Sequence, residues 1–331
     1  MKIFSTLMLI LLGSLFFLCQ LSTASTDQFK VLVVMSYEQD NPWCEEVKRG
    51  IDSVLSASSQ LNYFYMDTKK NLEGGPQKAQ EAKALLEQLQ PDGIITVDDN
   101  AQAMFAVPFL KDKTSVPVMF SGVNAEAEKY GYPASNISGI LERAHIQESL
   151  ALTKQLYPSL DTFLVLIKDS PSGKAMEKQV NSESAAYLAK VDAIKMIKSM
   201  EDLDREQLNR VDAILLIGVA GVIDENGSPL TYSEVLKKIS AIFPKPIIGG
   251  NQHHVEAGAL CAVAKTGHEQ GATAAGMLLQ AMQGTPVADI PVSRNYKGKR
   301  VINVSVMKAL GLKPRPTVLI GAELIKTKEQ L

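Results

Sequence analysis

The feature that most constrains the fold of this chain is a regular alternation between short apolar runs and longer amphipathic stretches. The run KVLVVM at residues 30–35 has no polar face, as expected for a strand that is covered on both sides of a parallel sheet. Helical spacing follows over residues 45–55, and the pattern then repeats. Strands that alternate with helical stretches predict right-handed βαβ units, and therefore an α/β fold with parallel sheets.

The alternation occurs twice along the chain. In the first half we expect strands at 30–35, 62–66, 93–97 and 116–120 and helices at 45–55 and 77–89. A connection through Gly131, Pro133 and Gly139 follows. In the second half we expect helices at 146–156, 172–189, 201–209, 233–243, 268–282 and 307–310 and strands at 162–167, 192–197, 213–217, 246–248, 260–264 and 300–304. The halves share no short repeat, which predicts two similar domains and not a solenoid.

The N-terminus predicts export. Lys2 precedes an apolar run over 7–18, and small residues at 22–24 suit a signal-peptidase cleavage site, so we expect a cleavable signal over 1–24 and a periplasmic mature protein. The run is shorter than the roughly 20 residues of a membrane span, although a retained anchor is an alternative. Lipid attachment at Cys19 is another alternative, which we favour less because Leu18 stands where a small residue is usual.

Length, charge and cysteine content limit the function classes. Removing 24 of 331 residues leaves 307, a length typical of two domains. With 34 basic and 36 acidic residues, the chain offers no electrostatic case for binding nucleic acid or an anionic membrane surface. After cleavage only Cys44 and Cys261 remain, and we expect buried free thiols, with a single disulfide bridge as the alternative.

Candidate binding residues follow from strand ends, because ligands of open α/β sheets bind beyond the carboxyl ends of the strands. The residues at these positions are small polar groups, carboxylates, a glycine, an apolar residue and aromatics, and the set favours a small polar or zwitterionic organic ligand. They are Ser36, Tyr37, Trp43, Asp98, Asp99, Asn100, Gly122 and Asn124 in the first half and Ser170, Val219 and Asn251 in the second.

Some of these residues suggest particular roles. Ser36, with helix N-terminal amides, would hold a carboxylate, and Asp98 or Asp99 would hold an ammonium group. Trp43 would lie against an apolar portion of the ligand. Structural roles are the alternatives: Asp99 or Asn100 would cap a helix, and Trp43 would be a half-buried core residue.

Enzyme signatures are missing from the sequence. It contains neither a G-x-S-x-G elbow nor a G-x-x-x-x-G-K-[ST] phosphate loop. His253, His254 and Glu256 lack the spacing of a zinc-binding helix, so we expect structural or surface histidines and no metal, cofactor or catalytic residue. A periplasmic enzyme that uses the same cleft is the alternative from another class.

Several segments carry a family resemblance. They are VLVVMSYEQDNPWCEEVKRGIDSVL from Val31, PDGIITVDDNAQ from Pro91, VPVMFSGVNAE from Val116, EAGALCAVAKTGHEQGATAAGMLLQAMQGTPVADIPV from Glu256 and RVINVSVMKALGLKPRP from Arg300. In order and spacing they resemble the substrate-binding components of ABC transporters, specifically the family grouped with tryptophan- and tyrosine-binding lipoproteins. The resemblance implies a type I periplasmic binding protein, with two Rossmann-like lobes whose parallel sheets are joined by a three-segment hinge.

That resemblance implies lobe 1 at 29–121 plus 265–290 and lobe 2 at 122–264 plus 291–331, with the third crossing at 284–291. It also implies a monomer that captures an amino-acid-like ligand between the lobes and delivers it to an ABC permease, using candidates among those above: Ser36, Asp98, Asp99, Asn100, Asn124, Ser170 and Asn251. The alternative is a ligand-sensing subunit of a membrane receptor or kinase. The sequence departs from the family at the apolar strand end 218–221 and in lacking a clear lipid-attachment motif.

Overall fold

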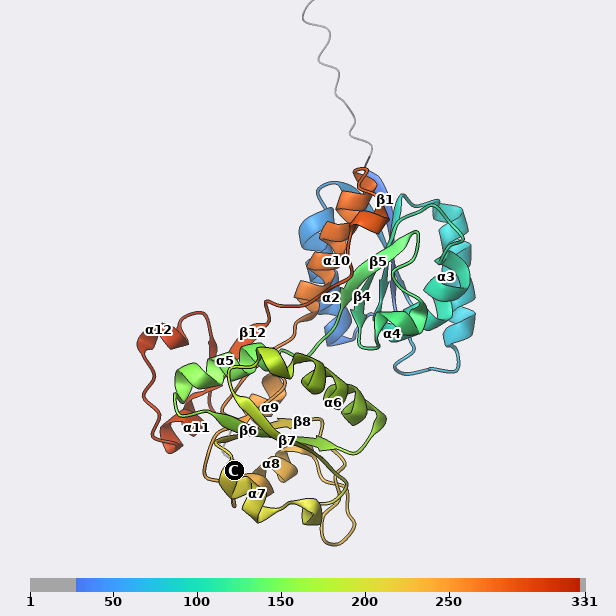
Figure 1. Ribbon diagram of the computed structural model, residues 1–331. Coiled ribbons are helices and arrows are strands. Elements are labelled where there is room, and N and C mark those ends of the chain that lie inside the picture. The colour runs from blue at the N-terminus through green and yellow to red at the C-terminus, as the bar shows by residue number, and fades with distance from the viewer. Residues whose placement is uncertain (1–27, 328–331) are drawn as a thin grey trace, which may run out of the picture.

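The computed structural model describes residues 28–327 and divides them into two α/β lobes (Figure 1). The predicted signal at 1–24, together with Cys19, lies outside this range. Between residues 28 and 327, no helix combines the length and apolarity needed to cross a bilayer. Cys44 and Cys261 are buried free thiols, as expected, and they lie in the cores of different lobes.

The first lobe is built on a six-stranded parallel sheet. Its strand order is β11-β5-β4-β3-β1-β2. The strands are β1 (Phe29–Met35), β2 (Ser59–Tyr65), β3 (Gly93–Val97), β4 (Val118–Val123), β5 (Ile137–Leu141) and β11 (Ser293–Arg294). The alternation of β1 side chains explains its continuous apolar run: Val31 and Val33 face one helical layer, and Leu32 and Val34 face the other.

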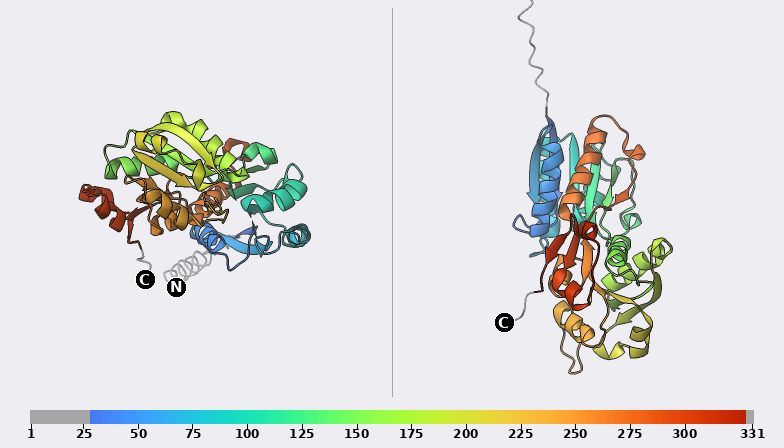
Figure 2. Two further views of the ribbon diagram at one scale, coloured as in Figure 1. Left: turned by 90° about the horizontal axis from the view of Figure 1, so that it is seen from below. Right: turned by 90° about the vertical axis from the view of Figure 1, so that its left-hand side faces the viewer.

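Helices cover both faces of that sheet. One face carries α2 (Pro42–Leu55) and α10 (Gly267–Met282), and the other carries α3 (Gly75–Leu89) and a π-helix, η1 (Gln102–Leu110). A short helix, α4 (Asp98–Ala101), leads from β3 into η1. Helix α10 is distant from this lobe in sequence, and its orange ribbon beside the blue segments in Figure 2 shows the chain returning to complete the lobe.

The second lobe holds a seven-stranded sheet of order β13-β12-β10-β9-β8-β6-β7. Every neighbouring pair is parallel except β10 with β12. The strands are β6 (Thr162–Lys168), β7 (Lys190–Ile197), β8 (Ala213–Ile217), β9 (Ile247–Ile248), β10 (Cys261–Ala264), β12 (Lys299–Asn303) and β13 (Glu323–Ile325). The helices are α5 (Ile146–Leu156), α6 (Pro171–Glu183), α7 (Arg205–Arg210), α8 (Tyr232–Ser240), α9 (Gln252–Glu256), α11 (Val304–Ala309) and α12 (Pro316–Leu319), with short 3₁₀ turns beside some of them.

The chain crosses between the lobes three times, at 142–145, 265–266 and 295–298. β5 and β11 run directly into the first and third crossings, and β10 runs directly into the second. The carboxyl ends of the parallel strands in each sheet therefore face the other lobe, which is where the strand-end rule places a ligand.

The sheets divide the chain at different residues from those predicted. The predicted boundary at 121 lies inside β4, and the first sheet also takes in β5 and β11, which were assigned to lobe 2. β5 was missed because it contains Gly139, which looked like part of a connection. A Cβ at this position would lie 2.3 Å from the Phe120 carbonyl oxygen, so the close approach of β4 requires glycine.

The third crossing also differs from its predicted place. Residues 284–291 pack onto the first lobe, where Ile290 is buried and its carbonyl accepts a 2.6 Å hydrogen bond from the Ser138 hydroxyl. The chain leaves that lobe only after Arg294. By contrast, the predicted helix at 146–156 and strand at 213–217 coincide with α5 and β8.

Helices α2 and α10 approach closely because glycines lie at their contact. A Cβ on Gly271 would lie 2.1 Å from the Val47 carbonyl oxygen, and one on Gly50 would lie 2.2 Å from the His268 carbonyl oxygen. Both distances are too short for a side-chain carbon, so any larger residue must push the helices apart.

We therefore expect Gly271→Ala to lower the free energy of unfolding by about 1–3 kcal/mol, because it overpacks a backbone contact. Gly276→Ala in the same helix is the matched control: nothing lies within 4 Å of its Cβ, so better helix propensity should raise stability by up to about 1 kcal/mol. Urea unfolding of both variants measures the difference. Equal effects from the two substitutions would contradict the close-contact explanation.

Candidate functional site between the two lobes

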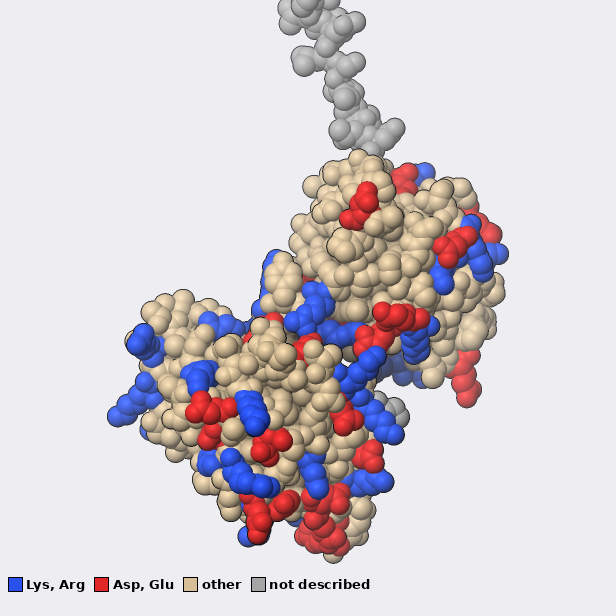
Figure 3. Space-filling view, viewed as in Figure 1, with Lys and Arg blue, Asp and Glu red and all other residues tan. Residues whose placement is uncertain are grey.

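A cavity of about 370 Å³ opens between the lobes, and charged side chains of both signs gather where the lobes meet (Figure 3). We call it the interlobe cavity. Its lining comes from the first lobe, from the crossings and from helix α6 of the second lobe. The lining residues are Asp99, Asn124, Ala125, Glu126, Lys129, Glu142, Arg143, Ala144, Ser172, Ala175, Met176, Gln179 and Lys265.

Asp98 lies close behind the first-lobe wall of this cavity in an unusual environment. Its side chain is buried, and its backbone adopts φ +66°, a left-handed conformation that is uncommon for residues other than glycine. The Trp43 indole N–H donates a 2.9 Å hydrogen bond to Asp98 Oδ1, while Oδ2 has no hydrogen-bond partner among the described residues. A buried carboxyl oxygen without a partner is costly, and such sites often serve function.

Burial raises the pKa of Asp98 well above its ordinary value, and the nearby charge of Glu142 raises it further. The Trp43 hydrogen bond acts in the opposite direction. Gly122 completes the enclosure: its φ is +68°, and a Cβ there would lie 2.7 Å from Asp98 Oδ1. The protein therefore holds a carboxyl group in a place that favours its neutral form.

Asp99 and Asn124 organise the rim of the cavity. Asp99 Oδ2 accepts a 3.0 Å hydrogen bond from the Asn124 backbone N–H, and Asp99 Oδ1 accepts one of 2.7 Å from the Tyr130 hydroxyl. The Asn124 side chain is exposed, and its amide donates to the Gly122 carbonyl at 3.3 Å. Asp99 thus fixes the loop after β4, whereas Asn124 presents polar atoms to the cavity.

Three other first-lobe candidates have local partners. The Ser36 hydroxyl is fully buried, donates to the Val97 carbonyl at 2.6 Å and accepts from the Ala101 backbone N–H at 2.8 Å. Its position excludes the predicted contact with a carboxylate. The Asn100 amide donates to the Thr68 hydroxyl at 2.9 Å. Tyr37 is half-buried near Asp98, and burial raises the pKa of its hydroxyl.

In the second lobe, the strand-end candidates are scattered. Ser170 caps α6 by accepting from the Gly173 backbone N–H at 3.1 Å, and Asn251 caps α9. Val219 was a wrong candidate: its side chain is fully buried in the apolar core between the sheet and helices α7 and α8, so it cannot line the cavity.

The second-lobe residues that do line the cavity were missed by the sequence reasoning. Ser172, Met176 and Gln179 lie on one face of α6, together with Ala175. Their spacing of three and four residues is the sequence pattern that could have identified them, because residues at this spacing share one face of a helix. A helix that follows a strand end turns one face toward the ligand side of the sheet. This wall carries no charged side chain, in contrast to the wall formed by the first lobe.

The crossings contribute ion pairs to the cavity. The Lys265 ammonium group pairs with the Glu142 carboxylate, which is itself buried. The Arg143 guanidinium donates to the Asn124 carbonyl at 3.1 Å and to Glu126 Oε2 at 3.0 Å. Glu126, Glu142, Arg143 and Lys265 were not predicted, since each lies in a segment between strands that sequence patterns do not place in space.

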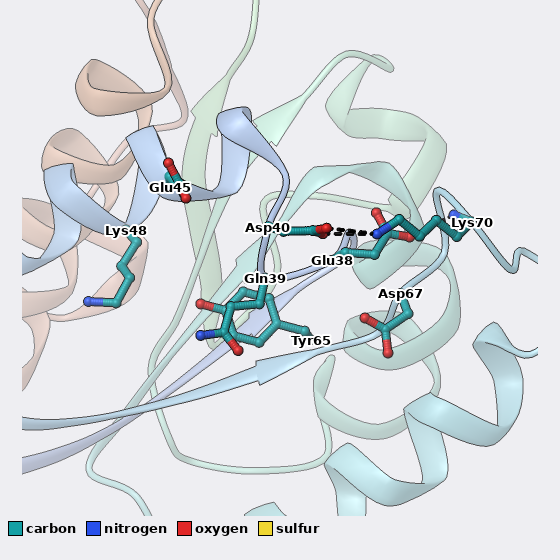
Figure 4. Close-up of a pocket in the computed structure, with 8 residues that line it drawn as sticks. All are labelled: Glu38, Gln39, Asp40, Glu45, Lys48, Tyr65, Asp67 and Lys70. Atoms are coloured by element: carbon teal, nitrogen blue, oxygen red, sulfur yellow. Dashed lines mark hydrogen bonds and ion pairs between the residues drawn. The ribbon is translucent and has the colours of Figure 1, made fainter.

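Figure 4 shows a second hollow, lined by the first lobe alone. Asp40 and Lys70 form a 3.0 Å ion pair at its rim, and both side chains are exposed. Because no second-lobe residue lines it, closure of the lobes would not enclose a ligand there. Among residues 28–327, no group of three or more His, Cys, Asp or Glu side chains is arranged to hold a metal ion.

Comparison with known proteins identifies the class that this architecture defines. Residues 56–326 match the model of the ABC transporter substrate-binding protein family, and the chain belongs to this family. Its members are solute-binding proteins and are typically extracytoplasmic. A search of curated proteins finds no match to the sequence.

Solved structures show the same fold. The ligand-free, open structure of CD0873, a substrate-binding protein with adhesive properties from Clostridium difficile, has a TM-score of 0.66 at 17% identity, covering 91% of this chain and 100% of that one. An ABC domain in complex with L-Trp from Streptococcus pneumonia has a TM-score of 0.53 at 21% identity, covering 90% and 100%. At these identities the likeness establishes the type I periplasmic binding fold.

The buried carboxyl of Asp98 makes stability depend on pH in a defined direction. Above about pH 4 the unfolded chain loses this proton while the folded protein keeps it, so the stability of the wild type falls as pH rises. Asp98→Asn keeps the shape and the acceptor for Trp43 and cannot ionise. We expect the free energy of unfolding of the variant, relative to that of the wild type, to increase by up to about 1.4 kcal/mol for each pH unit. This increase ends where the carboxyl group ionises in the folded wild type.

Urea unfolding of the wild type and Asp98→Asn at several pH values between 4 and 8 measures this difference. A constant difference across the range would show that Asp98 titrates normally. Asp192→Asn supplies the matched control, because it makes the same chemical change at an exposed position outside the lining of the interlobe cavity.

Proposed function

We propose that this protein is an extracytoplasmic solute-binding protein that captures a small, polar, amino-acid-like ligand between its lobes and delivers it to an ABC permease. The supporting observation is the interlobe cavity, which draws its lining from both lobes and from the crossings. Its volume of about 370 Å³ suits a small organic molecule, since ligand sites usually span about 300–1,000 Å³. Export would depend on the predicted signal at residues 1–24.

Each of the two walls would bind a different part of the ligand. The first-lobe side offers the unpartnered Asp98 carboxyl oxygen, which would accept a hydrogen bond from a ligand ammonium group, with Tyr37 and Trp43 beside it. The α6 wall offers Ser172, Met176 and Gln179, which suit the uncharged part of a ligand. A ligand that contacts both walls stabilises the closed arrangement of the lobes, and the permease would recognise that arrangement.

A thermal-shift screen of the mature protein against amino acids, nucleosides and small organic acids tests this function. A ligand present at 100 times its dissociation constant adds about 2.7 kcal/mol of stability. We expect an amino acid or a close analogue to stabilise the protein, and small-angle scattering should show compaction when it binds. Turnover of the ligand, or no stabilisation by any compound, would contradict the proposal.

Asp98→Asn tests the assignment of the ammonium group. Asp98→Asn cannot ionise beside a bound ammonium group, so it should weaken binding of the amine-bearing ligand by at least roughly tenfold, because a hydrogen bond to a charged group contributes about 1.5–3 kcal/mol. Isothermal titration calorimetry measures the change. Asp192→Asn, the matched control at an exposed position, should bind like the wild type. Equal binding by Asp98→Asn would remove Asp98 from the site.

A further inference from the structure

Asn251 and His254 lie on the edge of the second lobe that faces the first. Strand β9 lies between β8 and β10 and is parallel to both. The carboxyl end of β10 runs directly into the crossing at 265–266. Because β9 runs in the same direction, the residues that follow it, Gly249 to Asn251, are on this interlobe edge. His254 is in helix α9, which Asn251 caps.

The hydrogen bonds around His254 determine which ring nitrogen carries its proton. The Gly250 backbone N–H donates to His254 Nδ1 at 3.0 Å. A backbone N–H can only donate, so Nδ1 must present its lone pair and the hydrogen of the neutral ring must be on Nε2. His254 is 5% exposed, and its ring stacks on the ring of Tyr232, with 3.6 Å between the ring centroids. Burial, followed by the nearby charge of His253, lowers the pKa of His254 to about 3, which keeps the ring neutral.

The Asn251 side chain has an equally fixed orientation. Its Oδ1 accepts a 3.1 Å hydrogen bond from the His254 backbone N–H, which is the bond that caps α9. The amide nitrogen must then point the other way, and it lies 3.3 Å from His254 Nε2. Both of these nitrogens carry hydrogens and neither has a free lone pair. The two groups are therefore convergent donors that cannot satisfy each other, and a buried donor without an acceptor is costly.

We infer that Asn251 Nδ2 and His254 Nε2 form a subsite for the carboxylate group of the ligand. A carboxylate oxygen accepts hydrogen bonds from two donors at once, which neither side chain can do for the other. The inference rests on the proposed function and extends it. Asp98 would receive the ammonium group in the first lobe, and these two donors would receive the carboxylate in the second. The ligand class is then a zwitterionic amino acid or a close analogue that carries both groups.

This subsite also replaces a predicted one. The sequence suggested Ser36 as a carboxylate partner, but its hydroxyl is buried and already has two backbone partners. The α6 wall supplies no cation, and the two cations that line the cavity from the crossings, Lys265 and Arg143, are paired with Glu142 and Glu126. Lys129, the third cation of the lining, belongs to the first lobe. Two neutral N–H donors on the second lobe would bind the ligand carboxylate without adding a buried charge to the protein.

The test compares Asn251→Asp with the wild type. The substituted carboxylate keeps an oxygen to cap α9 and gives His254 Nε2 an acceptor, so the variant should fold. It also replaces a donor with a negative charge. Binding of the L-amino acid that gives the largest thermal shift should fall roughly tenfold to a hundredfold. Binding of the carboxamide of the same amino acid, which is at least tenfold weaker in the wild type, should stay equal or improve in the variant.

Asn226→Asp is the matched control, because it makes the same chemical change at an exposed turn of the second lobe. It should bind both compounds as the wild type does. Isothermal titration calorimetry measures the affinity of the wild type and of each variant for the amino acid and for its carboxamide. A merely structural role of Asn251 would weaken the acid and the amide alike, and that result would overturn the inference, as would unchanged binding of the acid.

A measurement without ligand supplies a second readout. Nitrogen NMR of the ¹⁵N-histidine-labelled wild type at pH 7 should show His254 neutral and protonated at Nε2, and saturation with the amino acid should shift that N–H signal. A charged ring, or a proton on Nδ1, would overturn the inference. If no compound stabilises the wild type, the proposed function itself fails; if the wild type binds an amino acid and Asn251→Asp binds it equally, only the carboxylate subsite fails.

Discussion

The side chain of Gln270 is the contact on which the two-lobed arrangement depends. It lies one turn into α10, directly after the second crossing, and it is fully buried. Its oxygen accepts from the Gly122 backbone N–H at 2.9 Å, and its nitrogen donates to the Leu141 carbonyl at 3.2 Å and to Asn295 Oδ1 at 3.3 Å. One amide group therefore joins the ends of β4 and β5 to the third crossing. Asn295 extends this link, because it exchanges hydrogen bonds with both backbone groups of Arg143 in the first crossing, at 2.7 and 2.9 Å.

Glu269, the neighbour of Gln270, fixes the rest of the third crossing. Its carboxylate accepts hydrogen bonds from the backbone N–H groups of Tyr296, Lys297 and Gly298, at 2.8 to 3.0 Å. Three N–H groups that would otherwise lie unpaired between the lobes are thus satisfied by one buried carboxylate. The third crossing is therefore held at the end near the first lobe.

The chemistry of the two facing edges is complementary in the same way. The first lobe holds a carboxyl group with one unpartnered oxygen, and the second holds two donors without an acceptor. Neither condition is favourable in either lobe alone, because the first leaves a buried oxygen unsatisfied and the second sets two part-buried N–H donors against each other. Each lobe therefore has polar atoms whose unmet hydrogen bonds lower its stability, and a ligand between the lobes would supply the missing partners. This is the arrangement expected of a protein whose closed state is stabilised by its ligand.

The sequence by itself determined the α/β class, the number of lobes and most of the strands, because a strand covered on both faces must be apolar at every covered position, as residues 31–35 are. It also placed the first-lobe candidates after strands whose carboxyl ends face the second lobe. It failed at β5, where Gly139 serves a close contact between strands and not a turn, and at Val219, where an apolar residue after a strand belongs to the core.

Tertiary structure alone decided which polar groups lack partners. Ser36 and Asp98 are both polar residues that follow apolar strands, yet the hydroxyl of one is fully bonded and one oxygen of the other is not. The roles of Gln270 and Asn295, and the orientation of Asn251 against His254, depend on segments far apart or on hydrogen bonds of fixed direction. Local sequence patterns report which face of an element is buried, because burial follows the period of the helix or strand. They carry no information on which donor meets which acceptor, because those pairs form only when distant segments come together.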